Sequence, residues 1–264
     1  MGAGTDGKSA AIYALLDGNG SGKLTTKNEG EITVGHEKSV GIYAANKSGQ
    51  GKEKSEAINS KQISVSAKNS AGMIGEKSIL RNTATASGEG IVLTANSTGG
   101  MIGKAESEVK NEGIIETKTA TPTTASEGLV GISLDKSKGE NTANGTINLD
   151  TKYSTGMYGK NSSDVSNKGS IKATKEYAIG MAGDSSTLTN SHEILLEAAD
   201  STGMFGKDNS TLLNDMNGKI TAKKEKSVGM FSKNNSTEAI NKGNIKTEGE
   251  SSAGMFGEKG KLKN

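Results

Sequence analysis

The stretch STGMYG at residues 154–159 returns as STGMFG at 201–206 and as SAGMFG at 252–257. Looser copies, in which a small residue precedes Met or Ile, occur throughout the chain at intervals of 23 to 31 residues. Such self-similarity is typical of a solenoid, in which each repeat contacts only its neighbours. The ten copies are centred on Ile12, Gly41, Gly72, Gly100, Gly131, Gly156, Gly180, Gly203, Gly229 and Gly254.

A second phrase, Asn-x-Gly-x-Ile, accompanies the first in most repeats. An apolar or small residue stands two positions before most of these Asn residues, as Val165 does before Asn167. Alternation along strands places that residue, the Ile of the second phrase and the residue after the repeated Gly on the inward face. Each coil therefore contains three short strands, and the inward column includes Met73, Met101, Met157, Met181, Met204, Met230 and Met255.

The repeated Asn residues are interpreted as structural. Asn and Gly tolerate positive φ, so we expect these Asn residues to occupy corners of the coils. Amides stacked at one corner can hydrogen-bond from coil to coil. A row of ligand-binding amides is the functional alternative. The predicted ladder consists of Asn28, Asn59, Asn111, Asn167, Asn190, Asn214 and Asn241.

Composition alone is misleading for this chain, because it favours disorder whereas the spacing of the apolar residues favours a solenoid. Hydrophobic residues make up only 31% of the chain, a value that by itself favours disorder, but the formal net charge is only +2. Because a thin stacked column needs few apolar residues, their regular spacing outweighs their low number. The prediction is a right-handed parallel β-helix of about ten coils and no long helix, with the handedness taken from the usual parallel connection.

One solenoid over 1–264 is expected, with longer coils in 1–150 and shorter, more regular coils in 151–264. The extra residues of the first part are expected to form protruding loops at 45–57 and 116–127. The second of these contains Pro122, the only proline, which would remove a ladder hydrogen bond inside a strand. Lys52 and Pro122 are therefore candidate contact residues. The chain is expected to be a segment of a longer repeat array.

The sequence offers little for catalysis or cofactor binding. It contains no cysteine, and its two histidines, His36 and His192, have no metal-ligand partner at a recognisable spacing. The nine Asp residues do not recur in one column of adjacent coils, as a two-carboxylate glycosidase site would require. Lysines alternate with glutamates and Arg81 is the only arginine, so no nucleic-acid-binding face is expected. We expect no enzyme activity, no cofactor, no metal and no membrane-spanning segment.

All eight aromatic residues lie within three positions of the repeated small residue, usually Gly, and six of them lie two positions after it. Alternation turns the residue two after the Gly outward, toward solvent. One interpretation is an exposed stripe that contacts a protein or a glycan. The other is a stack of rings that stabilises the coils. The candidate residues are Tyr43, Tyr158, Phe205, Phe231 and Phe256.

These phrases, together with NKGSI at 167–171 and NKGNI at 241–245, resemble the passenger repeats of large fusobacterial-type autotransporter adhesins over essentially the whole chain. The resemblance implies secretion, anchoring through a C-terminal outer-membrane barrel not present in this chain, exposure at the bacterial cell surface, and adhesion to a protein or glycan on host cells or other bacteria.

Three functions stay open at this point. The first is an adhesin segment that contacts its partner through loops or through the aromatic edge. The second is a purely structural stalk that displays a binding tip located elsewhere. The third is a β-helical enzyme that cleaves glycans, for which grouped carboxylates in a groove would be the sign.

Overall fold

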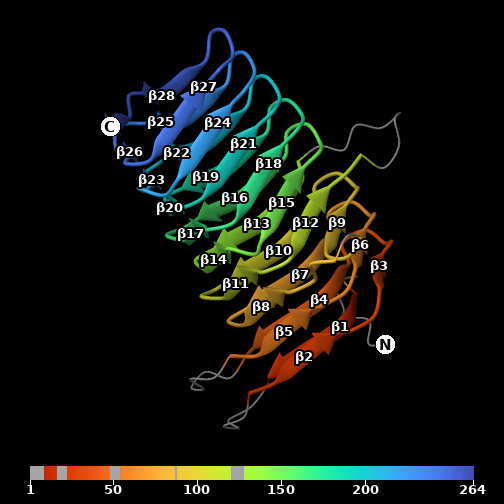
Figure 1. The fold of residues 1–264 in the computed structure, drawn as a ribbon. Coiled ribbons are helices and arrows are strands. Elements are labelled where there is room, and N and C mark those ends of the chain that lie inside the picture. The colour runs from red at the N-terminus through yellow and green to blue at the C-terminus, as the bar shows by residue number, and fades with distance from the viewer. Residues whose placement is uncertain (1–8, 17–22, 48–53, 87, 120–127) are drawn as a thin grey trace.

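The structure is a computed structural model that describes residues 9–16, 23–47, 54–86, 88–119 and 128–264. Within these ranges the chain forms 29 strands and no helix, and therefore no helix able to cross a membrane. Figure 1 shows the strands wound into a single parallel β-solenoid, which confirms the predicted fold class.

Each coil contributes one strand to each of three parallel sheets, which we call sheets A, B and C. Sheet A contains β1 (Ala10–Leu16), β4 (Val40–Asn46), β7 (Ala71–Glu76), β10 (Gly99–Lys104), β13 (Val130–Asp135), β16 (Thr155–Lys160), β19 (Ile179–Asp184), β22 (Thr202–Lys207), β25 (Val228–Lys233) and β28 (Ala253–Glu258). Sheet B contains β2 (Thr25–Asn28), β5 (Glu56–Asn59), β8 (Ile79–Asn82), β11 (Glu108–Asn111), β14 (Lys138–Asn141), β17 (Asp164–Asn167), β20 (Thr187–Asn190), β23 (Thr211–Asn214), β26 (Glu238–Asn241) and β29 (Lys261–Lys263). Sheet C contains β3 (Ile32–Val34), β6 (Ile63–Val65), β9 (Ile91–Leu93), β12 (Ile114–Thr117), β15 (Thr146–Leu149), β18 (Ser170–Ala173), β21 (Glu193–Leu196), β24 (Lys219–Ala222) and β27 (Asn244–Thr247).

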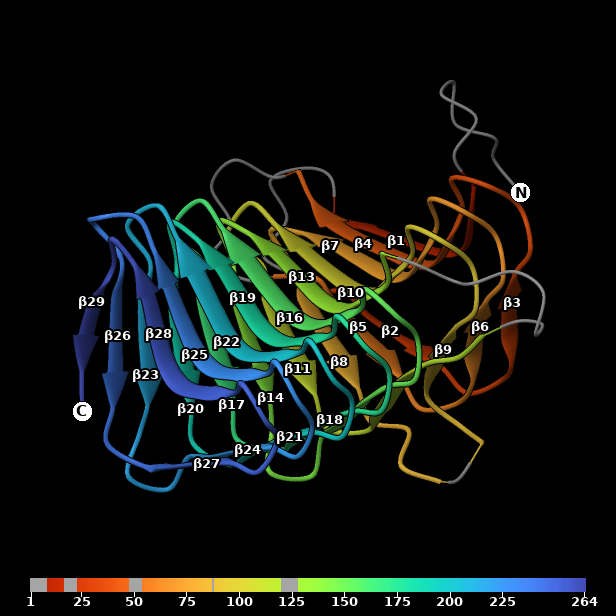
Figure 2. The ribbon, with the colours of Figure 1, turned by 90° about the horizontal axis from the view of Figure 1, so that it is seen from above.

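The strands of each sheet follow one another in chain order. Sheets A and B have ten strands and sheet C has nine, so the described residues form nine complete coils and two strands of a tenth. Figure 2 shows the three sheets surrounding one core, with the coils stacked from β1 to β28. Because every strand pairs with its equivalent in the next coil, most backbone donors and acceptors are satisfied between coils.

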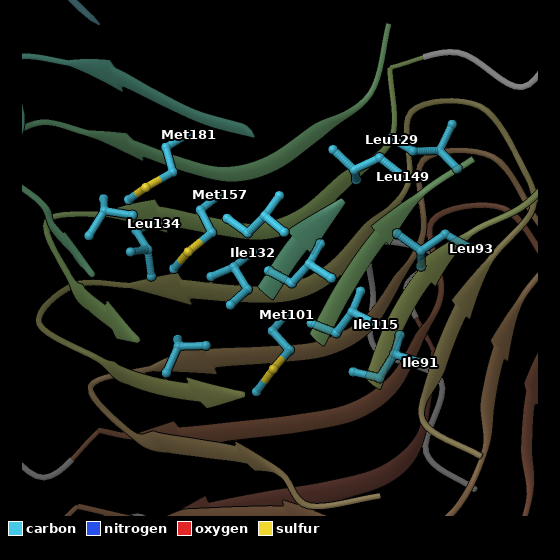
Figure 3. Packing of buried hydrophobic residues seen from close by; sticks show 14 of the residues in the cluster. Ile91, Leu93, Met101, Ile115, Leu129, Ile132, Leu134, Leu149, Met157 and Met181 are labelled. Atoms are coloured by element: carbon cyan, nitrogen blue, oxygen red, sulfur yellow. The ribbon is translucent and has the colours of Figure 1, made fainter. Parts of the chain in front are cut away.

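The core consists of apolar columns that run along the stack. Met157 of β16 lies between Ile132 and Met181 of the neighbouring strands, and all three side chains are fully buried. Isoleucines of sheet C, such as Ile115 of β12, face this column from the opposite side (Figure 3). The column includes the predicted inward methionines, of which only Met255 in the last coil is partly exposed.

The glycine before each Met lies where two coils and two sheets meet. A Cβ added to Gly203 would lie 2.5 Å from the carbonyl oxygen of Gly229 and 2.6 Å from a methyl group of Ile220. No side chain fits there without displacing backbone, so glycine is required at this corner. In the last coil the restriction is lifted, since a Cβ on Gly254 would meet only Ile245, at 3.7 Å.

Candidate functional site

The residues two after the repeated glycines form one continuous row on the outer face of sheet A, which we call the outer row. Paired strands place these residues in direct register from coil to coil. Most are half-buried, whereas Tyr13 and Phe256 at the two ends are 58% and 48% exposed. The outer row consists of Tyr13, Tyr43, Ile74, Ile102, Ser133, Tyr158, Ala182, Phe205, Phe231 and Phe256.

A second row of small and apolar side chains accompanies the outer row. The strand bends at the repeated glycine, so that the residue before the glycine also faces outward. A Cβ added to Gly99, for example, would lie 2.9 Å from the side chain of Ile102 in the outer row. Simple alternation did not predict this row, because it assumes an unbent strand. In later coils its members are Val130, Thr155, Ile179, Thr202, Val228 and Ala253.

Several aromatic rings of the outer row contact each other. Tyr13 and Tyr43 are stacked with ring centroids 5.1 Å apart, and Phe231 makes edge-on contacts with Phe205 and Phe256 at 5.3 and 5.1 Å. Burial raises the pKa of the Tyr43 hydroxyl, and Glu76 raises it further. The predicted contact residues thus combine partial exposure with packing between coils.

Charged residues flank the outer row at the ends of the sheet A strands from β7 to β22. Their signs alternate from coil to coil, and neighbours form ion pairs, such as Lys160 with Asp135 at 3.1 Å and Lys207 with Asp184 at 2.8 Å. The pKa of Asp135 is lowered, first by a hydrogen bond from Asn161 and then by Lys160. Carboxylates of this column are therefore separated by lysines rather than grouped. The column contains Glu76, Lys104, Asp135, Lys160, Asp184 and Lys207.

The repeated Asn residues form a ladder inside the solenoid, at the ends of the sheet B strands, and do not occupy the positive-φ positions of the turns. Each ends a strand of sheet B, and its Nδ2 donates to the Oδ1 of the Asn in the next coil, at 2.8 Å from Asn167 to Asn190. The prediction of positive φ is wrong for them, since the non-glycine residues with positive φ lie in the turns between sheets. The sequence pattern also missed three members, Asn82, Asn141 and Asn264, because the phrase after them is interrupted or ends. The full ladder runs Asn28, Asn59, Asn82, Asn111, Asn141, Asn167, Asn190, Asn214, Asn241 and Asn264.

A second polar ladder escaped the sequence analysis. Before each sheet B strand from β11 to β23 stands a buried serine whose hydroxyl accepts the backbone N–H of the equivalent serine in the preceding coil, as Ser163 does from Ser137 at 3.2 Å. Serine is common elsewhere in this chain, so only its constant distance from the Asn ladder could have revealed the column. The same contact repeats from Ser78 to Ser210.

Lys52 and Pro122, the predicted loop contacts, lie outside the described residues. The neighbouring Lys54 is described, and its ammonium donates at 2.8 Å to the carboxylate of Glu108, which lies two coils further along the solenoid.

Two further tyrosines lie in the turns from sheet C to sheet A. Tyr153 and Tyr177 occupy the same turn position in successive coils, both with positive φ, and their rings stack with centroids 4.8 Å apart. Their side chains are among the exposed large hydrophobic residues of the described chain, at 50% and 42%. Lys152 pairs with Glu176 at 2.5 Å, and its pKa is raised mainly by that pair, with smaller contributions from both tyrosines.

Beside this tyrosine pair the turns enclose a groove of about 440 Å³. Its lining is mostly charged or polar and comes from five successive coils. The lining residues are Lys152, Thr174, Lys175, Glu176, Glu197, Ala198, Ala199, Lys223, Lys224, Glu225 and Gly249.

Residues that could carry metal or acid–base chemistry are scattered. In the described ranges, no three His, Asp or Glu side chains are grouped so that they could hold a metal ion. His192 is exposed in a turn of sheets B and C, where its backbone carbonyl accepts from Asn190. His36 lies six coils away, in an exposed turn.

Comparison with known protein families identifies a related domain. The family model of the BigA third pectate lyase-like domain matches residues 48–218 and again residues 120–263. No curated protein and no solved structure matches the chain. The overlapping matches agree with a repeat array and support a passenger-type domain, without pointing to fusobacteria. With its parallel coils and more than half of its length covered by the model, the chain belongs to the family of the BigA third pectate lyase-like domain.

Proposed function

We propose that this chain is a passenger segment of a surface adhesin, exposed outside the bacterial cell and attaching it to host cells or other bacteria. The observation that carries the proposal is the outer row. It extends a partly exposed and mostly apolar surface along sheet A from Tyr13 to Phe256, interrupted by the polar Ser133 and the buried Ala182. The family match supports a surface passenger, and the fusobacterial autotransporter type is the finer form of the same proposal.

The physical argument rests on what surrounds the outer row. Elsewhere the surface carries many ion pairs between coils, such as Lys223 with Glu197 and Lys168 with Glu140. Such exposed pairs keep rods soluble and apart but contribute little binding energy. Continuous apolar patches on a soluble protein usually mark interaction sites. The outer row and its neighbouring row of small residues therefore form the most suitable contact surface for a partner.

The test is attachment of the labelled chain to epithelial cells and to partner bacteria. We expect saturable binding that falls at least fivefold in the variant F205S/F231S. K168S serves as the matched control, because Lys168 lies on the surface of another sheet corner. Circular dichroism and thermal melting are measured on each variant. Unchanged attachment by a folded F205S/F231S variant would contradict a role of the outer row.

A purely structural stalk is the second candidate, and one observation favours it. The phenylalanines of the outer row contact each other edge-on, an arrangement that stabilises adjacent coils without any partner. If the folded chain attaches to neither cell type, and F205S/F231S lowers only the melting temperature, the stalk is the better description.

Glycan cleavage is the third candidate. We propose that the chain does not catalyse it, because the carboxylates flanking the outer row alternate with lysines, as Asp135 does with Lys160. The family name contains the words pectate lyase-like, so polygalacturonate is the substrate to test. Incubation with calcium is expected to yield no unsaturated product absorbing short-wavelength ultraviolet light, and formation of that product would overturn this part of the proposal.

A further inference from the structure

The groove beside Tyr153 and Tyr177 exists because one coil departs from the pattern of its neighbours. The backbone N–H of Asp200 donates to the carbonyl of Glu225, as that of Tyr153 donates to the carbonyl of Glu176. Ala199, which precedes Asp200, therefore occupies the same turn position as Glu225 in the next coil. At this position and the one before it, neighbouring coils carry Lys175-Glu176 and Lys224-Glu225. The intervening coil carries Ala198 and Ala199, which leaves a notch between two walls of long side chains.

The dimensions follow from the stacking of the coils. Coils in register are separated by about 4.8 Å, so the backbones of the two walls lie about 10 Å apart, centre to centre. A pyranose ring fits a notch of this size when it lies across the coils. The groove volume of about 440 Å³ has room for more than one such ring.

The lining offers both donors and acceptors. It contains four lysines and three glutamates, and Thr174 adds a hydroxyl. Several of these groups are held in place by ion pairs, since Glu197 contacts both Lys172 and Lys223 at 2.9 Å. Nearly balanced charges suit a ligand with many hydroxyl groups better than a polyanion.

The tyrosine pair does not line the groove but borders it, because Tyr153 and Tyr177 directly follow the lining residues Lys152 and Glu176 in the chain. Tyr177 is followed in its column by Asp200, a much smaller residue, and the ring remains 42% exposed. The two rings stack with their centroids 4.8 Å apart, at the edge of the groove that Lys152 lines. Aromatic side chains next to oriented polar groups are the usual composition of a ligand site.

We propose that this groove binds an oligosaccharide, with a sugar ring against Tyr177 and its hydroxyl groups bonded to the lysines and glutamates of the walls. The inference rests on the proposed attachment function and deepens it by naming a glycan as a partner, and it adds a contact in the turns between sheets C and A to that of the outer row.

The experiment uses the whole chain and an immobilised panel of defined oligosaccharides built from neutral hexoses, from N-acetylhexosamines or from uronic acids. The tightest-binding member is then titrated by calorimetry. The variant A198K/A199E fills the notch with the residues that neighbouring coils carry. The variant Y153N/Y177N removes both rings and keeps a residue that tolerates positive φ, as Asn69 does at the same turn position.

We expect each of these two variants to bind at least tenfold more weakly, while K168S, which alters an exposed lysine between sheets B and C, stays within twofold of the unaltered chain. Melting temperatures identify any variant that has lost its fold. The inference is overturned if no oligosaccharide of the panel binds, or if the folded A198K/A199E variant binds as well as the unaltered chain.

The cell-attachment assay separates this inference from the proposed function. If A198K/A199E attaches to cells as the unaltered chain does, the groove is not the attachment site although attachment itself stands. If the unaltered chain binds a sugar that A198K/A199E does not bind, yet attaches to no cell, the groove is a glycan site and the attachment function is wrong.

Discussion

At the corner between sheets A and B, one residue of each sheet points into a shared space. In most coils a glycine of sheet A faces a large residue of sheet B, as Gly159 faces Val165, whose methyl group would lie 2.5 Å from an added Cβ. One coil reverses the arrangement, with Leu134 in sheet A and Gly139 in sheet B. An added Cβ on Gly139 would lie 2.5 Å from Leu134. The corner therefore accommodates one large side chain from either strand but not two.

This exchange predicts strong coupling between Leu134 and Gly139. L134G alone leaves a cavity and should lower the free energy of unfolding by about 2–5 kcal/mol. G139L alone places a second large side chain in a filled space and should cost about 1–3 kcal/mol or more. The double variant L134G/G139L recreates the arrangement of the neighbouring coils and should be more stable than either single variant.

Urea unfolding of the four proteins measures the coupling as a double-mutant cycle. If the two single costs simply add in the double variant, the corner does not work by sharing one space.

At the scale of the elements, the ends of the sheet B strands are held together by amides. Asn190 accepts from Asn167 at 2.8 Å, donates to Asn214 at 2.8 Å and donates to the backbone oxygen of His192 at 3.1 Å, in a position without solvent access. Buried polar groups in such a network are expensive to leave unpaired. The ladder therefore favours one register of the coils over all others.

Replacing Asn190 by Ala should lower the free energy of unfolding by about 1–3 kcal/mol, because an amide of each neighbouring coil loses a partner. N217A is the control, since Asn217 is an exposed turn residue of the next coil, and its effect should stay within about 0.5 kcal/mol. Chemical denaturation monitored by circular dichroism provides both values. Equal stability of the two variants would show that the ladder contributes nothing.

The sequence was sufficient for the strands and the inward columns but not for the turns. The glycine before Met157 and the Ile at 171 recur with the period of the coil, and burial confirms both columns. The turns differ because positive φ is adopted there by Lys, Tyr, Asp and Ser as well as by Asn, so residue type did not identify those positions. The groove could not be predicted for a related reason, since Ala198 and Ala199 indicate a notch only when the coils are aligned in space.

At the scale of the whole molecule, the solenoid is a chain of nearest-neighbour contacts. Each sheet A strand pairs only with the strands of the adjacent coils, and β28 is paired on one side only within the described residues. In such a stack the effect of a local defect depends on its position, because an interior coil packs against two neighbours and a terminal coil against one. Met157 is fully buried in an interior coil, whereas Met255 in β28 is only partly buried.

The variant M157A should therefore lose more unfolding free energy than M255A, and its effect should extend to more coils. M157A removes a fully buried side chain and should cost about 2–5 kcal/mol. M255A should lower the free energy of unfolding less, because Met255 is already partly exposed to solvent and β28 pairs with a neighbouring strand on one side only within the described residues. Hydrogen exchange read by mass spectrometry should show M157A speeding exchange in β13 and β19 on both sides, and M255A speeding it only around β25 and β28. Uniformly faster exchange throughout the chain in both variants would instead mean that the solenoid opens as one cooperative unit, and the nearest-neighbour description would then be wrong.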